Sequence, residues 1–176
     1  MDTAARRAAI SETLRTAEKP VSASALARRY QVSRQIIVGD IALLRAAGER
    51  IFATPRGYVY DVGHNDSGAV VRTIACRHRG ERALVEELYT VVDLGGEVLD
   101  VIVEHAVYGQ LIGQLQIRSR FDVDAFVEKL NQYRAAPLSS LTEGIHLHTL
   151  SCPSEEVFSR IQKALRESGI LLTGEA

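Results

Sequence analysis

Residues 33–48 carry the start and end signals of one short helix. Ser33 is a good N-cap, because its hydroxyl can accept hydrogen bonds from the free amides of the first turn. Gly48 suits the left-handed residue that ends a helix. Three apolar residues recur at helical spacing and predict the buried stripe of this helix: Ile37, Ile41 and Leu44.

A second helix is predicted directly upstream, from Ser22 as its N-cap through Tyr30, with Leu26 buried. Residues 31–33 then form a tight turn. A short helix, a three-residue turn and a capped second helix make the helix-turn-helix pattern. Two ordinary helices of a bundle share this spacing, so the flanking residues decide between the two interpretations.

The flanking residues favour a winged helix-turn-helix over residues 1–60. A first helix is predicted over 4–17, and Lys19-Pro20 ends it because the residue before proline avoids the helical region. Two short β-prone runs predict a hairpin: 51–54 and 57–60. Arg56 would lie near the tip of this wing, where a guanidinium can reach phosphate or a minor groove.

Charge is divided unevenly along the chain. Residues 1–60 carry ten Lys and Arg against five acidic residues, a net +5, whereas residues 61–176 carry eleven against seventeen, a net −6. A basic N-terminal third beside an acidic remainder is typical of a DNA-binding module joined to a sensing domain. No apolar run approaches the ~20 residues of a membrane span, and Cys76 and Cys152 suit reduced, buried thiols in a cytoplasmic protein.

Residues 61–69 are polar and glycine-rich and predict a linker, and residues 70–176 predict a second domain. The predicted order of its elements is β-α-β-β-α-β-α, which implies an α+β sandwich with helices against one sheet. Its helix over 121–133 is expected to bury Phe126, Val127 and Leu130. The expected strands are 70–76, 97–107, 111–117, 144–150 and a short one at 170–172, and the other helices are 81–94 and 153–168.

Two histidines lie close together in the predicted strand 144–150. Because side chains alternate along a strand, His146 and His148 point to the same face, which favours a transition-metal site. His78, just past the first strand, and a carboxylate on the next helix could complete it. Helical phase puts Glu87 beside the buried stripe and Glu86 nearly opposite, so Glu87 is the better ligand. The alternative is that both histidines of the pair face solvent.

Together these segments resemble the niacin-responsive repressors of bacterial NAD synthesis, which join a biotin-repressor-like winged helix to a three-histidine domain. The resemblance covers nearly the full length of the chain. It rests on Ser33-Arg34-Gln35 with Asp40-Ile41 and Leu44-Arg45, on residues 53–58, on His78 with Glu86-Glu87-Leu88, on residues 100–109, and on Pro137-Leu138 with residues 144–149. It implies nicotinic acid as corepressor and a divalent ion, nickel or zinc in kind, held by His78, Glu87, His146 and His148.

The sequence departs from the family pattern at two points. Position 39 is glycine, where winged helices of this type usually have a larger polar or basic residue. The segment from His78 to Glu87 is one residue longer than expected, which keeps Glu86 open as the carboxylate ligand.

We therefore expect a homodimeric transcriptional repressor that binds double-stranded operator DNA and is not an enzyme. A dimer is expected because one small winged helix makes few contacts, and the acidic domain is the natural dimerisation and sensing unit. The predicted DNA contacts are Ser33, Arg34 and Gln35 on the recognition helix and Arg56 on the wing.

Three alternatives stay open. His105 and Tyr108 are candidate effector contacts, but they also suit a structural histidine and an aromatic that packs in a turn. A metal-dependent hydrolase fused to a DNA-binding module could use the same metal ligands, because a metal with an open position can activate water. A regulator that responds directly to metal is the third.

Overall fold

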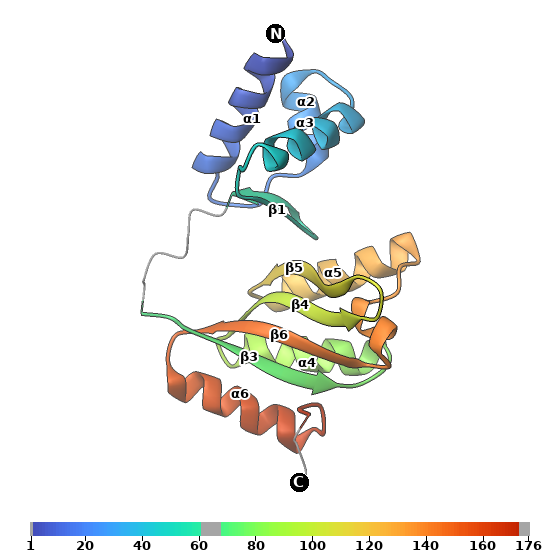
Figure 1. Ribbon diagram of the computed structural model, residues 1–176. Coiled ribbons are helices and arrows are strands. Elements are labelled where there is room, and N and C mark those ends of the chain that lie inside the picture. Colours follow the sequence, from blue (N-terminus) through green and yellow to red (C-terminus); the bar gives the residue numbers. More distant parts are fainter. Residues whose placement is uncertain (1, 61–67, 173–176) are drawn as a thin grey trace. The chain divides into compact units, whose positions relative to one another are not determined.

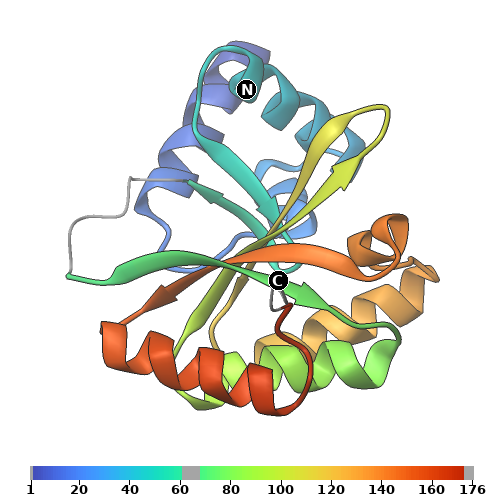
Figure 2. The same cartoon turned by 60° about the horizontal axis from the view of Figure 1, so that its bottom comes forward.

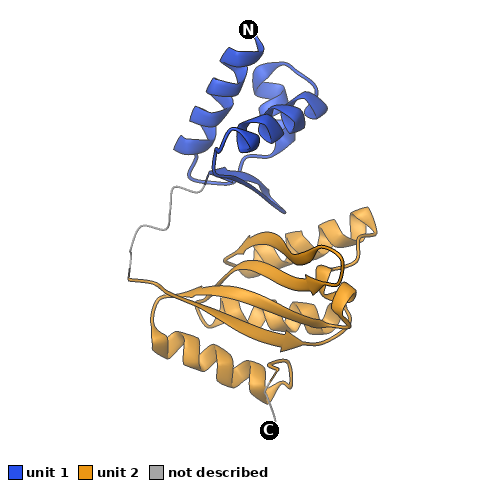
Figure 3. Cartoon of the chain, in the orientation of Figure 1, with its two compact units in different colours: residues 1–65 blue, residues 66–176 orange. Residues whose placement is uncertain are grey.

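The protein folds as two compact units, residues 1–65 and 66–176 (Figure 3). The structure is a computed structural model that describes residues 2–60 and 68–172. Each unit has its own hydrophobic core. The expected linker over 61–69 lies outside the described residues except for its last two positions. Within the described ranges no helix has the length and apolar character needed to cross a bilayer.

The N-terminal unit is three helices followed by a two-stranded hairpin (Figure 1). The predicted N-caps are confirmed, because the Ser22 hydroxyl accepts from the Ala25 amide at 3.1 Å and the Ser33 hydroxyl from the Ile36 amide at 3.2 Å. The predicted winged helix-turn-helix is therefore present. Its elements are α1 (Thr3–Thr16), α2 (Ala23–Tyr30), α3 (Arg34–Ala46), β1 (Ile51–Thr54) and β2 (Gly57–Tyr60).

A buried ion pair ties the first helix to the third. Nε of Arg6 on α1 lies 2.6 Å from Oδ2 of Asp40 on α3, and the Asp40 side chain is only 4% exposed. A buried carboxylate is costly unless it is paired, so this contact fixes α3 against α1. Tyr30 at the end of α2 joins the second helix to the first, because its hydroxyl donates to the Ala9 carbonyl on α1 at 2.8 Å.

Glu49 joins α1 to the wing. One of its carboxylate oxygens accepts from the Tyr60 hydroxyl at 2.6 Å, from Arg15 at 2.8 Å and from the Ser11 hydroxyl at 3.1 Å. The hydrogen bonds from Tyr60 and Arg15 hold the pKa of Glu49 below its ordinary value. The ionised form of Glu49 is therefore the form that stabilises this unit.

The C-terminal unit is a four-stranded antiparallel sheet in the order β3-β6-β4-β5. Its three α-helices lie on one face of the sheet (Figure 2), and together they enclose the core of this unit. This arrangement is the α+β sandwich expected from the order of the elements. They are β3 (Val70–Arg77), α4 (Glu81–Asp93), β4 (Glu97–His105), β5 (Gly109–Ile117), α5 (Arg120–Tyr133), η1 (Leu138–Thr142), β6 (Ile145–Cys152) and α6 (Glu155–Glu167).

Two details differ from the expectation. On α5 the residue that is fully buried is Val123, whereas Phe126, Val127 and Leu130 are only partly buried. The reason is that α5 packs against α4, so these three side chains lie at the margin of the core. The short strand expected at 170–172 is reduced to an isolated bridge between Leu171 and Cys76.

The Glu49 contacts predict how the N-terminal unit responds to acid. A carboxylate whose pKa is lowered by folding contributes stability above its unfolded pKa, about 4.5, and this contribution is lost as the pH falls through the folded value. We expect the stability of wild type and Glu49→Gln, measured by urea unfolding of the full chain, to converge as the pH drops below about 4.5. Glu12→Gln changes an exposed residue of α1 and should have the same pH dependence of stability as wild type. A stability difference between wild type and Glu49→Gln that stays constant over this pH range would contradict the role given to Glu49.

Candidate metal centre and DNA-binding surface

Four polar side chains meet inside the C-terminal unit. His78 follows β3, Glu87 lies on α4, and His146 and His148 lie on β6. The Glu87 Oε2 atom lies 2.6 Å from Nε2 of His78, 3.1 Å from Nε2 of His146 and 3.5 Å from Nε2 of His148. The structure thus brings all four of the predicted metal ligands to one point.

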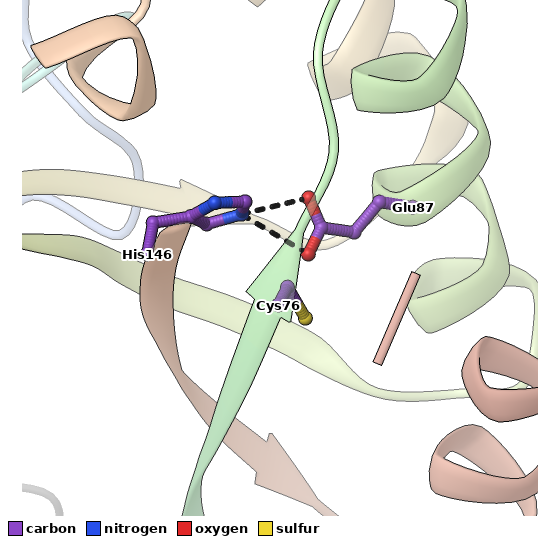
Figure 4. Close-up of side chains that lie close together, drawn as sticks. All are labelled: Cys76, Glu87 and His146. Carbon is purple, nitrogen blue, oxygen red and sulfur yellow. Dashed lines mark hydrogen bonds and ion pairs between the residues drawn. The ribbon is translucent and has the colours of Figure 1, made fainter. Parts of the chain in front are cut away.

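Helical phase puts Glu87 at the centre of this cluster. Leu84, Leu88 and Val91 form the buried stripe of α4, and Glu87 lies beside them with 1% of its surface exposed. Figure 4 shows its carboxylate pointing from α4 toward His146 on β6. Glu86 is exposed, so it is the less suitable of the two candidate carboxylates.

Strand alternation puts the histidine pair on the same face. His146 and His148 are buried, at 3% and 4% exposure, and the residue between them points to the other side of the sheet. The alternative in which the pair faces solvent is therefore wrong. Since β6 lies between β3 and β4, His146 pairs with Cys76 and His148 pairs with Ile74 and Val101.

His78 is held in the cluster by Gly144. The His78 amide donates to the Gly144 carbonyl at 3.3 Å. Gly144 has φ +92°, and a Cβ added there would lie 2.2 Å from the His78 carbonyl oxygen. Glycine is needed here both for the left-handed backbone and for this close approach.

Backbone carbonyls orient two of the imidazoles. Nδ1 of His146 lies 2.9 Å from the Gly144 carbonyl oxygen, and Nδ1 of His148 lies 2.7 Å from the Asp100 carbonyl oxygen. An Nδ1–H that donates to a carbonyl leaves the Nε2 lone pair free in a neutral imidazole, which is the arrangement found behind metal-bound histidines. The donor set of three imidazole nitrogens and a carboxylate therefore fits a transition-metal ion.

The charges of this cluster stabilise one another. Burial alone would raise the pKa of Glu87, but the positive charge of His148 and hydrogen bonds with all three histidines hold it well below its ordinary value. Burial alone would lower the pKa of His148, yet the Glu87 carboxylate raises it above its ordinary value. The site is thus built around an ionised, buried carboxylate that favours a positive charge beside it.

Cys76 is a neighbour of this cluster that the sequence did not predict as a ligand. It lies on β3 beneath Glu87 and His146 (Figure 4), and one donor atom from each of the three lies within 4.8 Å of the others. Burial, with the nearby Glu87, raises the pKa of the Cys76 thiol. Without a bound metal ion, Cys76 is therefore a protonated thiol at neutral pH, as expected of a buried cysteine.

The cluster forms the polar part of an otherwise apolar pocket. The four residues of the cluster line this pocket together with mostly apolar side chains. Its other walls come from α4, β4, β5, α5, and η1 with the proline that precedes it. They are Leu84, Leu88, Val101, Leu115, Phe126, Pro137, Leu138 and Ser139.

His105 ends β4 and Tyr108 lies in the turn between β4 and β5, and neither lines this pocket. Nδ1 of His105 accepts from the amides of Val107 and Tyr108, at 3.2 and 3.3 Å. The two rings contact each other with centroids 5.0 Å apart, and Tyr108 is 74% exposed. These contacts support the local, turn-stabilising interpretation of both residues.

The predicted DNA contacts lie at two places in the N-terminal unit. Ser33, Arg34 and Gln35 are exposed at the N-terminal end of α3. Arg56 instead lies half-buried beside residues 17–22. The wing packs closely there, because Val21 and Tyr58 exchange two backbone hydrogen bonds of 2.9 Å.

Two residues that orient the histidines of this cluster, Gly144 and Asp100, were not among the predicted ligands. Gly144 lies two residues before His146, so its position was a usable signal. The Asp100 carbonyl reaches His148 from the neighbouring strand, and only the pairing of β4 with β6 reveals it.

Comparison with known proteins identifies both units. Residues 71–174 match the 3H domain family and residues 6–59 match a helix-turn-helix domain family. The chain is 44% identical to the transcription repressor NadR of Bacillus subtilis over 160 residues, which are 90% of this chain and 88% of the relative. It is 42% identical to the probable transcription repressor NiaR of Thermotoga maritima over 167 residues, 95% and 93% of the two chains.

These relatives are named as transcription repressors, and this chain contains a helix-turn-helix domain, so the prediction of a DNA-binding repressor rather than an enzyme is confirmed. The chain belongs to the family of helix-turn-helix, 3H-domain transcription repressors that includes NadR and NiaR.

Proposed function

We propose that this protein represses genes of NAD biosynthesis and niacin uptake when nicotinic acid binds beside a nickel or zinc ion in its C-terminal unit. The observation that carries the proposal is the convergence of three imidazole Nε2 atoms on one buried carboxylate at the pocket wall. Kinship with named transcription repressors supports the regulatory part.

The metal would be held by His78, Glu87, His146 and His148, and it would supply a positive charge for the pyridine nitrogen or carboxylate of the effector. The chain's own side chains would do the rest. Leu115, Phe126 and Leu138 offer apolar surface to the faces of a small aromatic ring. The hydrogen bonds at Gly144 and Asp100 keep two imidazoles oriented for binding.

We propose that a homodimer binds the operator in the cytoplasm. Two N-terminal units on one DNA would double the phosphate and base contacts that a single small unit makes, and two-fold symmetry suits a palindromic operator. For any switch to exist, the effector-bound state must bind operator more tightly than the effector-free state.

The carboxylate offers a direct test of the metal centre. Glu87→Gln keeps the size of the side chain but removes its charge, so nickel or zinc affinity should fall by more than the roughly 10–100-fold that loss of an outer partner costs. Glu86→Gln is the matched control, since that residue is exposed and should leave affinity unchanged. Calorimetric titration of the chelator-treated full chain measures both. Equal affinities in the two variants would contradict the proposed ligand set.

The effector is tested on the same proteins. Nicotinic acid should bind metal-loaded wild type and raise its affinity for promoter DNA, and chelation or His146→Ala should abolish the response. Calorimetry and a DNA titration measure the two effects. Undiminished binding of nicotinic acid to metal-free protein would rule out the anchoring role of the metal. Metal alone giving the full DNA response would favour a direct metal sensor instead.

Gly144→Ala tests how the site is held together. The new Cβ would meet the His78 carbonyl oxygen at 2.2 Å, so His78 must shift, and we expect metal affinity to fall by roughly 10–100-fold. Gly109→Ala is the control: φ there is +71° and a Cβ meets no atom within 4 Å. Both changes carry a backbone cost of roughly 1–2 kcal/mol, which thermal unfolding measures. A metal affinity that is the same in both variants would contradict the role given to Gly144.

A further inference from the structure

The outer face of α3 is free of charge. Ile37, Ile41 and Leu44 turn toward the core of the N-terminal unit. With 3.6 residues per turn, the opposite side of the helix carries a strip of exposed, small or apolar residues. This outer strip is Gln35, Ile36, Gly39, Ala42, Leu43 and Ala46.

Nothing described within the chain requires glycine at position 39 of the outer strip. Gly39 lies in the middle of α3, where glycine is the least favourable residue apart from proline. Its φ is not in the left-handed region, and an added Cβ would meet no atom within 4 Å. Neither the backbone nor the packing of this unit requires glycine, so a close approach from outside the chain accounts for it.

The exposure of Ile36 and Leu43 is a second feature that the packing of this unit does not explain. They are 43% and 54% exposed, although both are large and apolar. Seven residues apart, they lie on the same side of the helix, with Gly39 between them along the strip. An apolar ligand surface on either side of Gly39 would cover both.

Cations border the outer strip. Arg34 and Arg45 are exposed and lie eleven residues apart, so they share one side of α3 over about 16 Å. An apolar strip beside a row of guanidinium groups is complementary to a DNA groove, where methyl groups and base edges lie between lines of phosphate.

We infer that the outer strip reads a half-site rich in A·T pairs in the major groove. Ile36 and Leu43 would contact thymine 5-methyl groups, the Gln35 amide would pair with adenine N6 and N7, and Gly39 would mark the closest approach of helix and bases. Guanine is read mainly by Arg or Lys, which the strip lacks. The inference rests on the proposed repressor function and adds which bases the repressor selects.

The probe is a duplex that the wild-type full chain, with nickel and nicotinic acid, enriches from a random library. Replacing thymine by uracil removes only the methyl group, so at one or more half-site positions wild type should lose about fourfold in affinity. Ile36→Ala should bind the thymine duplex more weakly and no longer distinguish uracil from thymine at that position. An Arg34→Ala control should keep the distinction and lose affinity for all sequences.

Gly39→Ala separates a DNA contact from a structural glycine by the sign of two effects. Helix propensity should raise the thermal midpoint of the N-terminal unit by roughly 4–8 °C. The new methyl group should lower affinity for the selected duplex by about tenfold, because it holds the helix away from the bases. A glycine that the fold requires would lower the thermal midpoint, and a glycine without a role in DNA binding would give the first change without the second.

The outcomes separate two kinds of failure. A wild-type chain that enriches no sequence would overturn the proposed repressor function and this inference with it. Enrichment of a duplex that is insensitive to uracil, or unimpaired binding by Gly39→Ala, would overturn this inference alone. A change in sedimentation of Ile36→Ala without a change in DNA affinity would assign the outer strip to a protein contact and would also overturn it.

Discussion

The C-terminal unit depends on one buried charge. Glu87 is 1% exposed. An ionised carboxylate in an apolar core is tolerated only beside positively charged groups or groups that can become protonated. Supplying those partners requires α4 to face β6 and requires the residue after β3 to turn inward. The sheet order with β6 next to β3 meets both needs. Removing the histidines would thus leave a fold with an unpaired charge at its centre.

The pocket above this charge has two chemical halves. One part of its wall is made of imidazole and carboxylate groups, and the rest is mostly aliphatic and aromatic side chains. A ligand suited to both halves is small, flat and apolar on its faces, with one polar end. On the proposal that nicotinic acid binds here, the apolar walls would contact the faces of its ring and the polar side would hold its charged group.

The features that the sequence predicted correctly depend on spacing within a single helix or strand. The caps at Ser22 and Ser33, the shared face of His146 and His148, and the inward phase of Glu87 each follow from the spacing within one element. What it missed depends on contacts between elements. The Gly144 backbone that holds His78 and the packing of Arg56 beside residues 17–22 arise from pairing across distant segments. Phe126 was misjudged for the same reason, since α5 packs mainly against α4 and Phe126 lies at the margin of the core.

The ion pair of Arg6 and Asp40 changes the electrostatic potential around α3. Asp40 follows Gly39 directly, and an uncompensated carboxylate there would repel the polyanion that the helix approaches. Arg6 cancels that charge from within the chain. In the proposed docking of α3 on DNA, Arg6 would thereby favour the attraction between protein and nucleic acid from a position on α1, and the first helix would belong to the electrostatics of the recognition surface.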